Sequence, residues 1–125
     1  MTAMRMAQTA YGQNAQTIKT PRGTEYEAFA WVTQRIKASH AKGRAGFADL
    51  AAALHDNRRL WSILASDVAD EGNALPRDLR ARIVYLAEYT QIHSQAVLSQ
   101  GASPTSLVDI NTAIMSGLRD QGPAT

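Results

Sequence analysis

The residue types that most often carry chemistry are few in this chain and poorly placed for it. His40, His55 and His93 have no partner at metal-ligand spacing, and no paired carboxylate–histidine motif occurs on a helical pattern. His93 lies on an apolar stripe, where a hydrogen-bonded core histidine is more common than a ligand or a general base. Residues 67–73 are acidic but lack the alternating ligands and closing glutamate of a calcium loop. We therefore expect no metal and no cofactor.

Nucleophilic catalysis is equally poorly supported. Ser62 and Ser66 fall within a helical pattern, without the sharp turn or the positioned base that activates a serine. The scattered glycines do not form a phosphate-binding loop. The chain contains no cysteine, which excludes a disulfide framework and a thiolate metal site and fits a cytosolic protein. We predict that the protein is not an enzyme.

The hydropathy pattern predicts no membrane-spanning helix. The longest apolar runs, residues 50–54 and 83–87, are far shorter than the ~20 residues that cross a bilayer. Residues 1–14 include Arg5 but no continuous apolar stretch, so we expect no signal peptide. A chain of 125 residues fits one domain with a core of its own.

Helical periodicity predicts an all-α fold, an antiparallel helical bundle of four main helices. Apolar residues recur at three- and four-residue steps in four segments, and no convincing strand pattern occurs. Because the loops between these segments are short, successive helices should be antiparallel. Residues 3–18 fit either a short N-terminal helix or an arm that orders only on a partner. We expect a single domain over residues 1–125, with residues 1–19 as its candidate flexible arm.

The ends of the four helices carry recognisable signals. The first helix begins at Pro21 or at Thr24 and ends near Ala41. A second, longer helix runs from Phe47 to Val68, both on its apolar stripe, with a break near Asp56 as an alternative.

The last two helices are delimited more sharply. The third spans residues 76–100 and starts with Pro76, and Gly101 follows where a left-handed C-terminal cap is expected. Ser103 then supplies an N-cap oxygen, and Pro104 occupies the first position of the last helix.

The apolar stripes indicate which side chains form the core. Trp61 continues the stripe of the second helix, so we expect its ring in the core. Arg58 and Arg59 would then cover the edge of this ring or pair with Asp56 or Asp67. The predicted core residues are Phe29, Trp61, Leu64, Ile83, Leu86, Ile110 and Ile114.

A second set of residues is predicted to bind a partner. Leu60 and Ile63 lie off the main stripe and widen the apolar arc, so they could form the floor of a groove for another helix. Arg59 beside Trp61 adds the residue types that concentrate binding energy at interfaces. Leu75 fits an interface and a hydrophobic staple equally well. The predicted partner-binding residues are Arg59, Leu60, Ile63, Asn73 and Leu75.

Three asparagines have structural explanations that we favour over functional ones. Asn73 can form an Asx-turn in the interhelical loop. Asn111 can hydrogen-bond a neighbouring backbone or Asn57 and so fix the register of the helices.

The formal charge of +2 is unevenly distributed along the chain. Residues 1–60 carry nine basic and four acidic side chains, and residues 61–125 carry four basic and seven acidic ones. Such polarity could steer a partner, but most surface charges belong to solvated faces that contribute little energy. We therefore favour the solvated interpretation.

The most distinctive sequence in the chain spans residues 57–82 and reads NRRLWSILASDVADEGNALPRDLRAR. It joins two amphipathic helical patterns through the breaker residues 70–73. Together with TPR at residues 20–22 and VDINTAIM at residues 108–115, it resembles the FlaF family of flagellar biosynthesis proteins from alphaproteobacteria. The resemblance covers most of the chain. The sequence departs from the family's pattern in the first half, most visibly in the glycine-rich linker of residues 42–46.

The resemblance implies a cytoplasmic protein that binds flagellin as an export chaperone and supports flagellin synthesis and secretion, alongside the translational regulator FlbT. The alternative is a post-transcriptional regulator of flagellin translation that acts through flagellin mRNA or FlbT. We rank direct RNA binding second, because the chain lacks RNP-type sequence and repeated basic–aromatic interleaving. The composition alone would predict only a soluble helical bundle.

Overall fold

The chain folds into four α-helices in a computed structural model, which describes the backbone of residues 21–120 and the side chains of residues 25–117. The elements are α2 (Pro21–Ala41), a 3₁₀ turn η1 (Gly43–Gly46), α3 (Phe47–Ala69), α4 (Arg77–Gln100) and α5 (Thr105–Asp120). Residues 21–120 contain no β-strand, so the predicted all-α bundle is confirmed. The expected N-terminal helix or arm lies outside the described residues.

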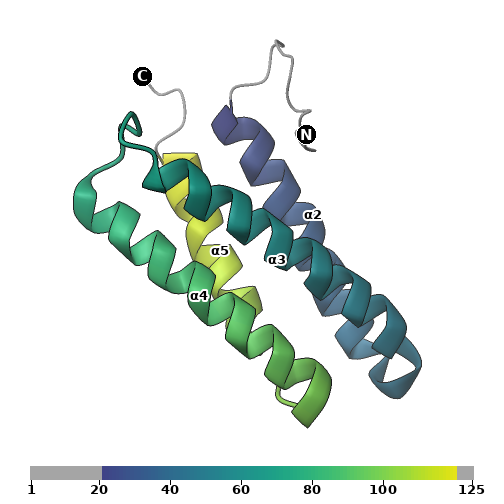
Figure 1. Cartoon of the computed structure of the whole chain (residues 1–125). Coiled ribbons are helices and arrows are strands. Elements are labelled where there is room, and N and C mark those ends of the chain that lie inside the picture. The colour runs from purple at the N-terminus through teal and green to yellow at the C-terminus, as the bar shows by residue number, and fades with distance from the viewer. Residues whose placement is uncertain (1–20, 121–125) are drawn as a thin grey trace.

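The four helices run alternately up and down, as the short loops predict (Figure 1). α2 packs along both α3 and α5, and α3 packs along α4. α4 and α5 touch over a much shorter stretch. The bundle is therefore well packed on three sides and loosely closed on the fourth.

Local sequence explains where the helices begin and end. Gly101 terminates α4 in the left-handed conformation, with φ at 73°, as predicted. α4 and α5 each begin one residue later than expected, because Pro76 and Pro104 precede the first helical residue. The backbone N–H of Thr105 donates to Ser103 Oγ at 3.1 Å, which satisfies one of the unpaired donors at the start of α5. α3 is continuous through Asp56, so the alternative of a break there is wrong.

The geometry of the linker explains why positions 43 and 46 are both glycine. Gly43 has φ at 62°, a conformation that side chains with a Cβ rarely adopt. A Cβ on Gly46 would overlap the carbonyl oxygen of Ser39, so only glycine lets η1 close this tightly against α2. The departure from the family's pattern in this linker is thus compatible with a tight α2–α3 turn.

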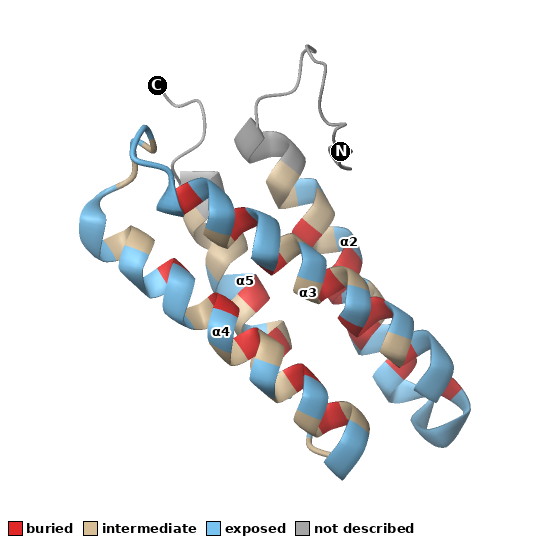
Figure 2. Cartoon of the chain, viewed as in Figure 1, coloured by how far each residue is buried: buried red, intermediate tan, exposed pale blue. Residues whose placement is uncertain are grey.

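The core consists of two clusters on the inner faces of the helices (Figure 2). One comprises Phe29, Trp61, Leu64, Val68, Ile83 and Ala87, and the other comprises Ile36, Leu50, Ala53, Leu54, Val97 and Leu107. Leu86, Ile110 and Ile114 are half-buried against the first cluster. Phe47 is 49% exposed, contrary to its expected place on the buried stripe, because it is the first residue of α3 and lies beyond the packed part of the bundle.

A buried polar network adjoins the first cluster at Trp61. Trp61 Nε1 donates to Asn111 Oδ1 at 2.8 Å. Asn111 Nδ2 in turn donates to Asn57 Oδ1 at 2.8 Å and to Thr33 Oγ1 at 3.0 Å. The predicted pairing of Asn111 with Asn57 is therefore confirmed, and the network joins α2, α3 and α5.

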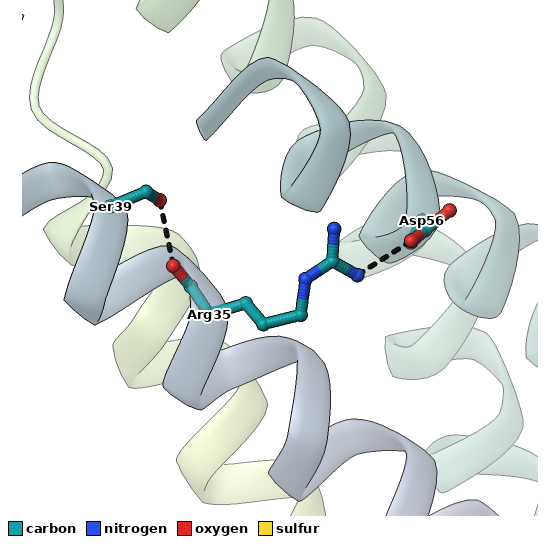
Figure 3. Close-up of polar contacts among 3 residues, drawn as sticks. All are labelled: Arg35, Ser39 and Asp56. Atoms are coloured by element: carbon teal, nitrogen blue, oxygen red, sulfur yellow. Dashed lines mark hydrogen bonds and ion pairs between the residues drawn. The ribbon is translucent and has the colours of Figure 1, made fainter. Parts of the chain in front are cut away.

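An ion pair ties the outer edges of α2 and α3 together (Figure 3). Arg35 Nη1 lies 2.6 Å from Asp56 Oδ2, and Ser39 Oγ donates to the Arg35 carbonyl oxygen at 2.7 Å. The alternative in which Arg58 or Arg59 pairs with Asp56 is wrong. Arg58 Nε instead donates to Gln91 Oε1 of α4 at 2.9 Å, so it braces the α3–α4 pair.

Candidate functional site

A cleft of about 730 Å³ lies at the end of the bundle where α3 leads into α4. It is lined by Glu25, Leu64, Ser66, Asp67, Val68, Asp70, Gly72, Asn73, Ala74, Leu75, Leu79, Ile83, Ile114 and Gly117. All four helices and the α3–α4 loop contribute to this lining, so the cleft exists only in the folded bundle.

The cleft lies at the end of the bundle where α4 and α5 are least tied to each other. Near their connecting turn, the hydroxyls of Tyr89 and Ser106 share a hydrogen bond of 2.9 Å. His93 Nε2 donates to the carbonyl oxygen of Ser103 at 2.8 Å in the same region. At the opposite end, α5 presents Gly117, where a Cβ would meet no heavy atom within 4 Å. The missing side chain at Gly117 leaves space that a longer residue would fill.

The floor of the cleft is apolar. Leu64 and Ile83 are buried members of the first core cluster, and Leu75, Leu79 and Ile114 are half-buried around it. The cleft is thus an extension of the core that remains accessible from outside, and its walls can bury further apolar surface when a partner covers them.

Asn73 gives the loop at the edge of the cleft a fixed conformation. Its Oδ1 accepts from the Leu75 N–H at 2.9 Å, which is the predicted Asx-turn, and its Nδ2 donates to the Asp67 carbonyl oxygen at 3.1 Å. The Gly72 N–H donates to Asp70 Oδ1 at 3.2 Å. These bonds hold Leu75 where it both contacts the core cluster and lines the cleft.

The described rim of the cleft is acidic. Glu25, Asp67 and Asp70 line it, and no lysine or arginine is among the described lining residues. Arg80 lies outside the lining and donates from Nη1 to the Val68 carbonyl oxygen at 3.4 Å. With Arg80 counted, acidic side chains still outnumber basic ones among the described residues at this edge.

A second, shallower hollow of about 430 Å³ lies between α3 and α4. Its lining residues are His55, Arg58, Arg59, Ser62, Ile63 and Gln91. Gln91 Nε2 donates to the Arg58 carbonyl oxygen and to Ser62 Oγ, at 3.2 and 3.3 Å. Ile63 is 40% exposed and is the one large apolar side chain in this lining.

The five predicted partner-binding residues fall into three different places. Asn73 and Leu75 line the deep cleft, and Arg59 and Ile63 line the shallow hollow. Leu60 packs partly against the core, although it lies off the main stripe. The structure therefore does not bring all five residues into one groove.

Among the described lining residues, sequence reasoning assigned a binding role only to Asn73 and Leu75, and Leu79, Ile114 and Gly117 are examples of those it missed. Leu79 and Ile114 lie on regular apolar stripes, and periodicity does not distinguish a core position from a cleft wall. Gly117 carried a usable signal, because glycine inside a helix costs about 1 kcal/mol relative to alanine and often has a packing or functional reason.

The described residues do not assemble a metal site, since no group of three or more His, Asp or Glu side chains is suitably placed among them. His93 is hydrogen-bonded, as expected, but it is half-exposed rather than part of the core. Its ring stacks on Tyr89 with centroids 5.3 Å apart, and this contact at the α4–α5 turn keeps it away from the centre of the bundle. No helix in residues 21–120 has the length and hydropathy to cross a membrane.

Residues 21–120 thus form a helical bundle that is fixed by a buried polar network and has a cleft with an apolar floor at one end. The chain belongs to the FlaF family, because the family model described as flagellar protein FlaF matches residues 7–118. The resemblance seen in the sequence is thereby confirmed, and the protein has a flagellar role. No curated protein and no solved structure matches the chain.

Proposed function

We propose that this protein binds flagellin before assembly, as an export chaperone that thereby supports flagellin synthesis and secretion. Membership of the FlaF family supports a role in the flagellar system. The single observation that carries the chaperone proposal is the 730 Å³ cleft, which has an apolar floor and opens at the α3–α4 end of the bundle. On this proposal the protein acts in the cytoplasm, where an FlbT-type regulator is a further candidate partner.

The size and the apolar floor of the cleft suit the apolar face of an amphipathic helix. Helix-in-groove recognition places apolar anchors at positions i, i+3 or i+4, and i+7 of the bound helix into a groove of this kind. A hollow of about 730 Å³ can take several such side chains, since binding pockets typically measure ~300–1,000 Å³. The terminal segments of flagellin are expected to form amphipathic helices that self-associate when left free, so covering their apolar faces would keep flagellin unassembled.

The alternative, direct binding to flagellin mRNA, has less support. Nucleic acid binding depends on basic side chains that are available to phosphates. In the described part of the basic first half, Arg35 pairs with Asp56, Lys42 lies 3.8 Å from Asp49, and Arg58 is bonded to Gln91. These side chains are partly neutralised or held by protein groups.

The proposal is tested by titrating the full chain with unassembled flagellin and, separately, with a flagellin leader RNA at physiological salt, by calorimetry. We expect saturable binding to flagellin, and RNA retention that is weak and falls steeply as the salt concentration rises. Tight, sequence-selective binding to the leader RNA without measurable affinity for flagellin would establish the alternative instead.

A further inference from the structure

We infer that the shallow hollow between α3 and α4 is a second protein-binding surface, and that it takes an acidic peptide segment of a partner protein. The hollow measures about 430 Å³, and its described lining comes only from α3 and α4, which pack side by side (Figure 1). It shares no described lining residue with the cleft. The inference therefore does not rest on the proposed binding of flagellin in the cleft.

The described lining of the hollow is basic. It contains Arg58, Arg59 and His55 and no aspartate or glutamate. Asp56 pairs with α2 instead, and Glu88 of α4 lies outside the described lining. No acidic side chain among the described residues forms an ion pair with either arginine. The two guanidinium groups therefore favour a partner that brings carboxylates to this hollow.

Arg58 is held in place before any partner binds. It is half-buried, and its Nε donates to Gln91 Oε1 at 2.9 Å. Gln91 Nε2 donates in turn to the Arg58 carbonyl oxygen at 3.2 Å and to Ser62 Oγ at 3.3 Å. Because Gln91 is neutral, these bonds fix the guanidinium group without cancelling its charge. A carboxylate can accept from the remaining N–H donors of Arg58, and little side-chain freedom is lost when it does.

An apolar side chain lies beside these charges. Arg59 and His55 are exposed and form no hydrogen bond or ion pair with a described residue. Ile63 is 40% exposed and lies four residues after Arg59 on α3, which places the two side chains on the same face of the helix. A bound segment can therefore place an apolar side chain on Ile63 and a carboxylate on Arg59 at the same time.

This combination suits an acidic peptide better than a nucleic acid. A peptide carries carboxylates and apolar side chains within a few residues of one another. Nucleic acid binding instead draws on several phosphates along the strand, about 6–10 in a typical footprint, whereas two arginines line this hollow. The apolar contact at Ile63 adds affinity that a phosphate cannot use.

The test uses the full chain and three fluorescently labelled peptides that share the same leucine anchors and differ only in the flanking residues, which are glutamate, glutamine or lysine. We expect the glutamate peptide to bind about tenfold more tightly than the lysine peptide at low salt. The difference should shrink at 0.5 M salt, because exposed charges are screened within a few ångströms there. Equal affinities, or a preference for lysine, would overturn the inference.

Matched variants locate the peptide in the hollow. Arg59→Gln and Ile63→Ser should each weaken binding of the glutamate peptide about two- to fivefold. Arg82→Gln is the control, because it removes the same charge from an exposed position on α4 outside the described lining and should leave the affinity unchanged. A loss of the same size in the control would show that net charge sets the preference, and would overturn the inference.

A uridine oligonucleotide separates the two classes of occupant. At physiological salt it should not displace the glutamate peptide. Displacement that is lost in Arg59→Gln would make nucleic acid the occupant of the hollow and overturn the inference.

Competition with flagellin separates this surface from the cleft. Unassembled flagellin at saturation should leave the glutamate peptide bound, and Gly117→Trp, which alters the cleft lining, should bind the peptide as the parent does. Displacement by flagellin, or loss of peptide binding in Gly117→Trp, would contradict a second surface. Failure of flagellin to bind at all would contradict the proposed function alone, because the peptide titrations decide this inference without flagellin.

Discussion

Trp61 donates its indole N–H to Asn111 Oδ1 across 2.8 Å, and both residues are fully buried. The bond joins α3 to α5, two helices that have few other contacts with each other. Because a buried polar group that lacks its partner is costly, only one alignment of α3 and α5 satisfies both groups. This bond therefore fixes the register across the bundle, and it holds α5 where Ile114 and Gly117 form one wall of the cleft.

Removing the amide of Asn111 should be strongly destabilising. Asn111→Ala leaves the Trp61 N–H without its acceptor and Asn57 Oδ1 and Thr33 Oγ1 without their donor, at a buried site. We expect the free energy of unfolding to fall by about 2 to 4 kcal/mol, measured by urea denaturation. Thr112→Ala, at the exposed neighbouring position, should change it by less than ~0.5 kcal/mol. Equal effects of the two substitutions would contradict a structural role of the network.

The two tryptophans should respond oppositely to truncation. Trp61 is fully buried and packs edge-to-face on Phe29 with ring centroids 5.5 Å apart, so Trp61→Ala should cost about 3 to 5 kcal/mol. Trp31 is 62% exposed and contacts the Arg35 guanidinium at 4.5 Å, so Trp31→Ala should cost no more than about 1 kcal/mol. Thermal melts of both variants decide this, and a larger loss at Trp31 would place the core elsewhere.

Two glycines in helical contexts provide a second matched pair. Gly117→Ala should stabilise the protein by about 0.5 to 1 kcal/mol, because alanine favours the helix and its Cβ meets no atom within 4 Å. Gly101→Ala should destabilise it by about 1 to 2 kcal/mol, since Gly101 has φ at 73°. Chemical denaturation of both variants measures the signs. Stabilisation by the substitution at Gly101 would rule out the left-handed cap.

Substitutions of Leu60 and Ile63 should have different effects on stability. Leu60→Ser should lower the free energy of unfolding by about 1 to 2 kcal/mol, because Leu60 packs partly against the core. Ile63→Ser should change it by less than ~0.5 kcal/mol, because that side chain is 40% exposed. If flagellin occupies the deep cleft, Ile63→Ser should also leave flagellin affinity unchanged in a binding titration. A marked loss of affinity in this variant would place the partner on the shallow hollow instead.

Most of the fold was predictable because its determinants are local. The stripe of Trp61, the left-handed cap at Gly101 and the proline before α5 are all readable from spacing and residue type. The exposure of Phe47 was not predictable, because a stripe gives the direction of a side chain but not whether a neighbouring helix extends far enough to cover it. Pairing of Asp56 with Arg35 was missed for a similar reason, since it depends on how α2 and α3 align.

The cleft was only partly predictable. Asn73 and Leu75 were found because turn chemistry and a leucine before proline are local signals. Ile63 was grouped with them because it lies off the main apolar stripe, and Arg59 because arginine is common at interfaces, but both residues line the shallow hollow. Nothing in a single sequence reveals that α4 and α5 touch over a short stretch, and the cleft depends on this relationship.

The most direct test of flagellin binding in the cleft is a steric block at Gly117. Gly117→Trp places a large ring in a lining position where a Cβ has free space, so the fold should be kept. Thr112→Trp places the same ring at an exposed position of the same helix outside the lining, as the control. Affinity for unassembled flagellin is measured by titration, with the melting temperature of each variant. We predict a loss of at least about tenfold, equivalent to ~1.4 kcal/mol, for Gly117→Trp and none for Thr112→Trp, with both variants folded. Parent-like affinity in a folded Gly117→Trp variant would contradict flagellin binding in this cleft.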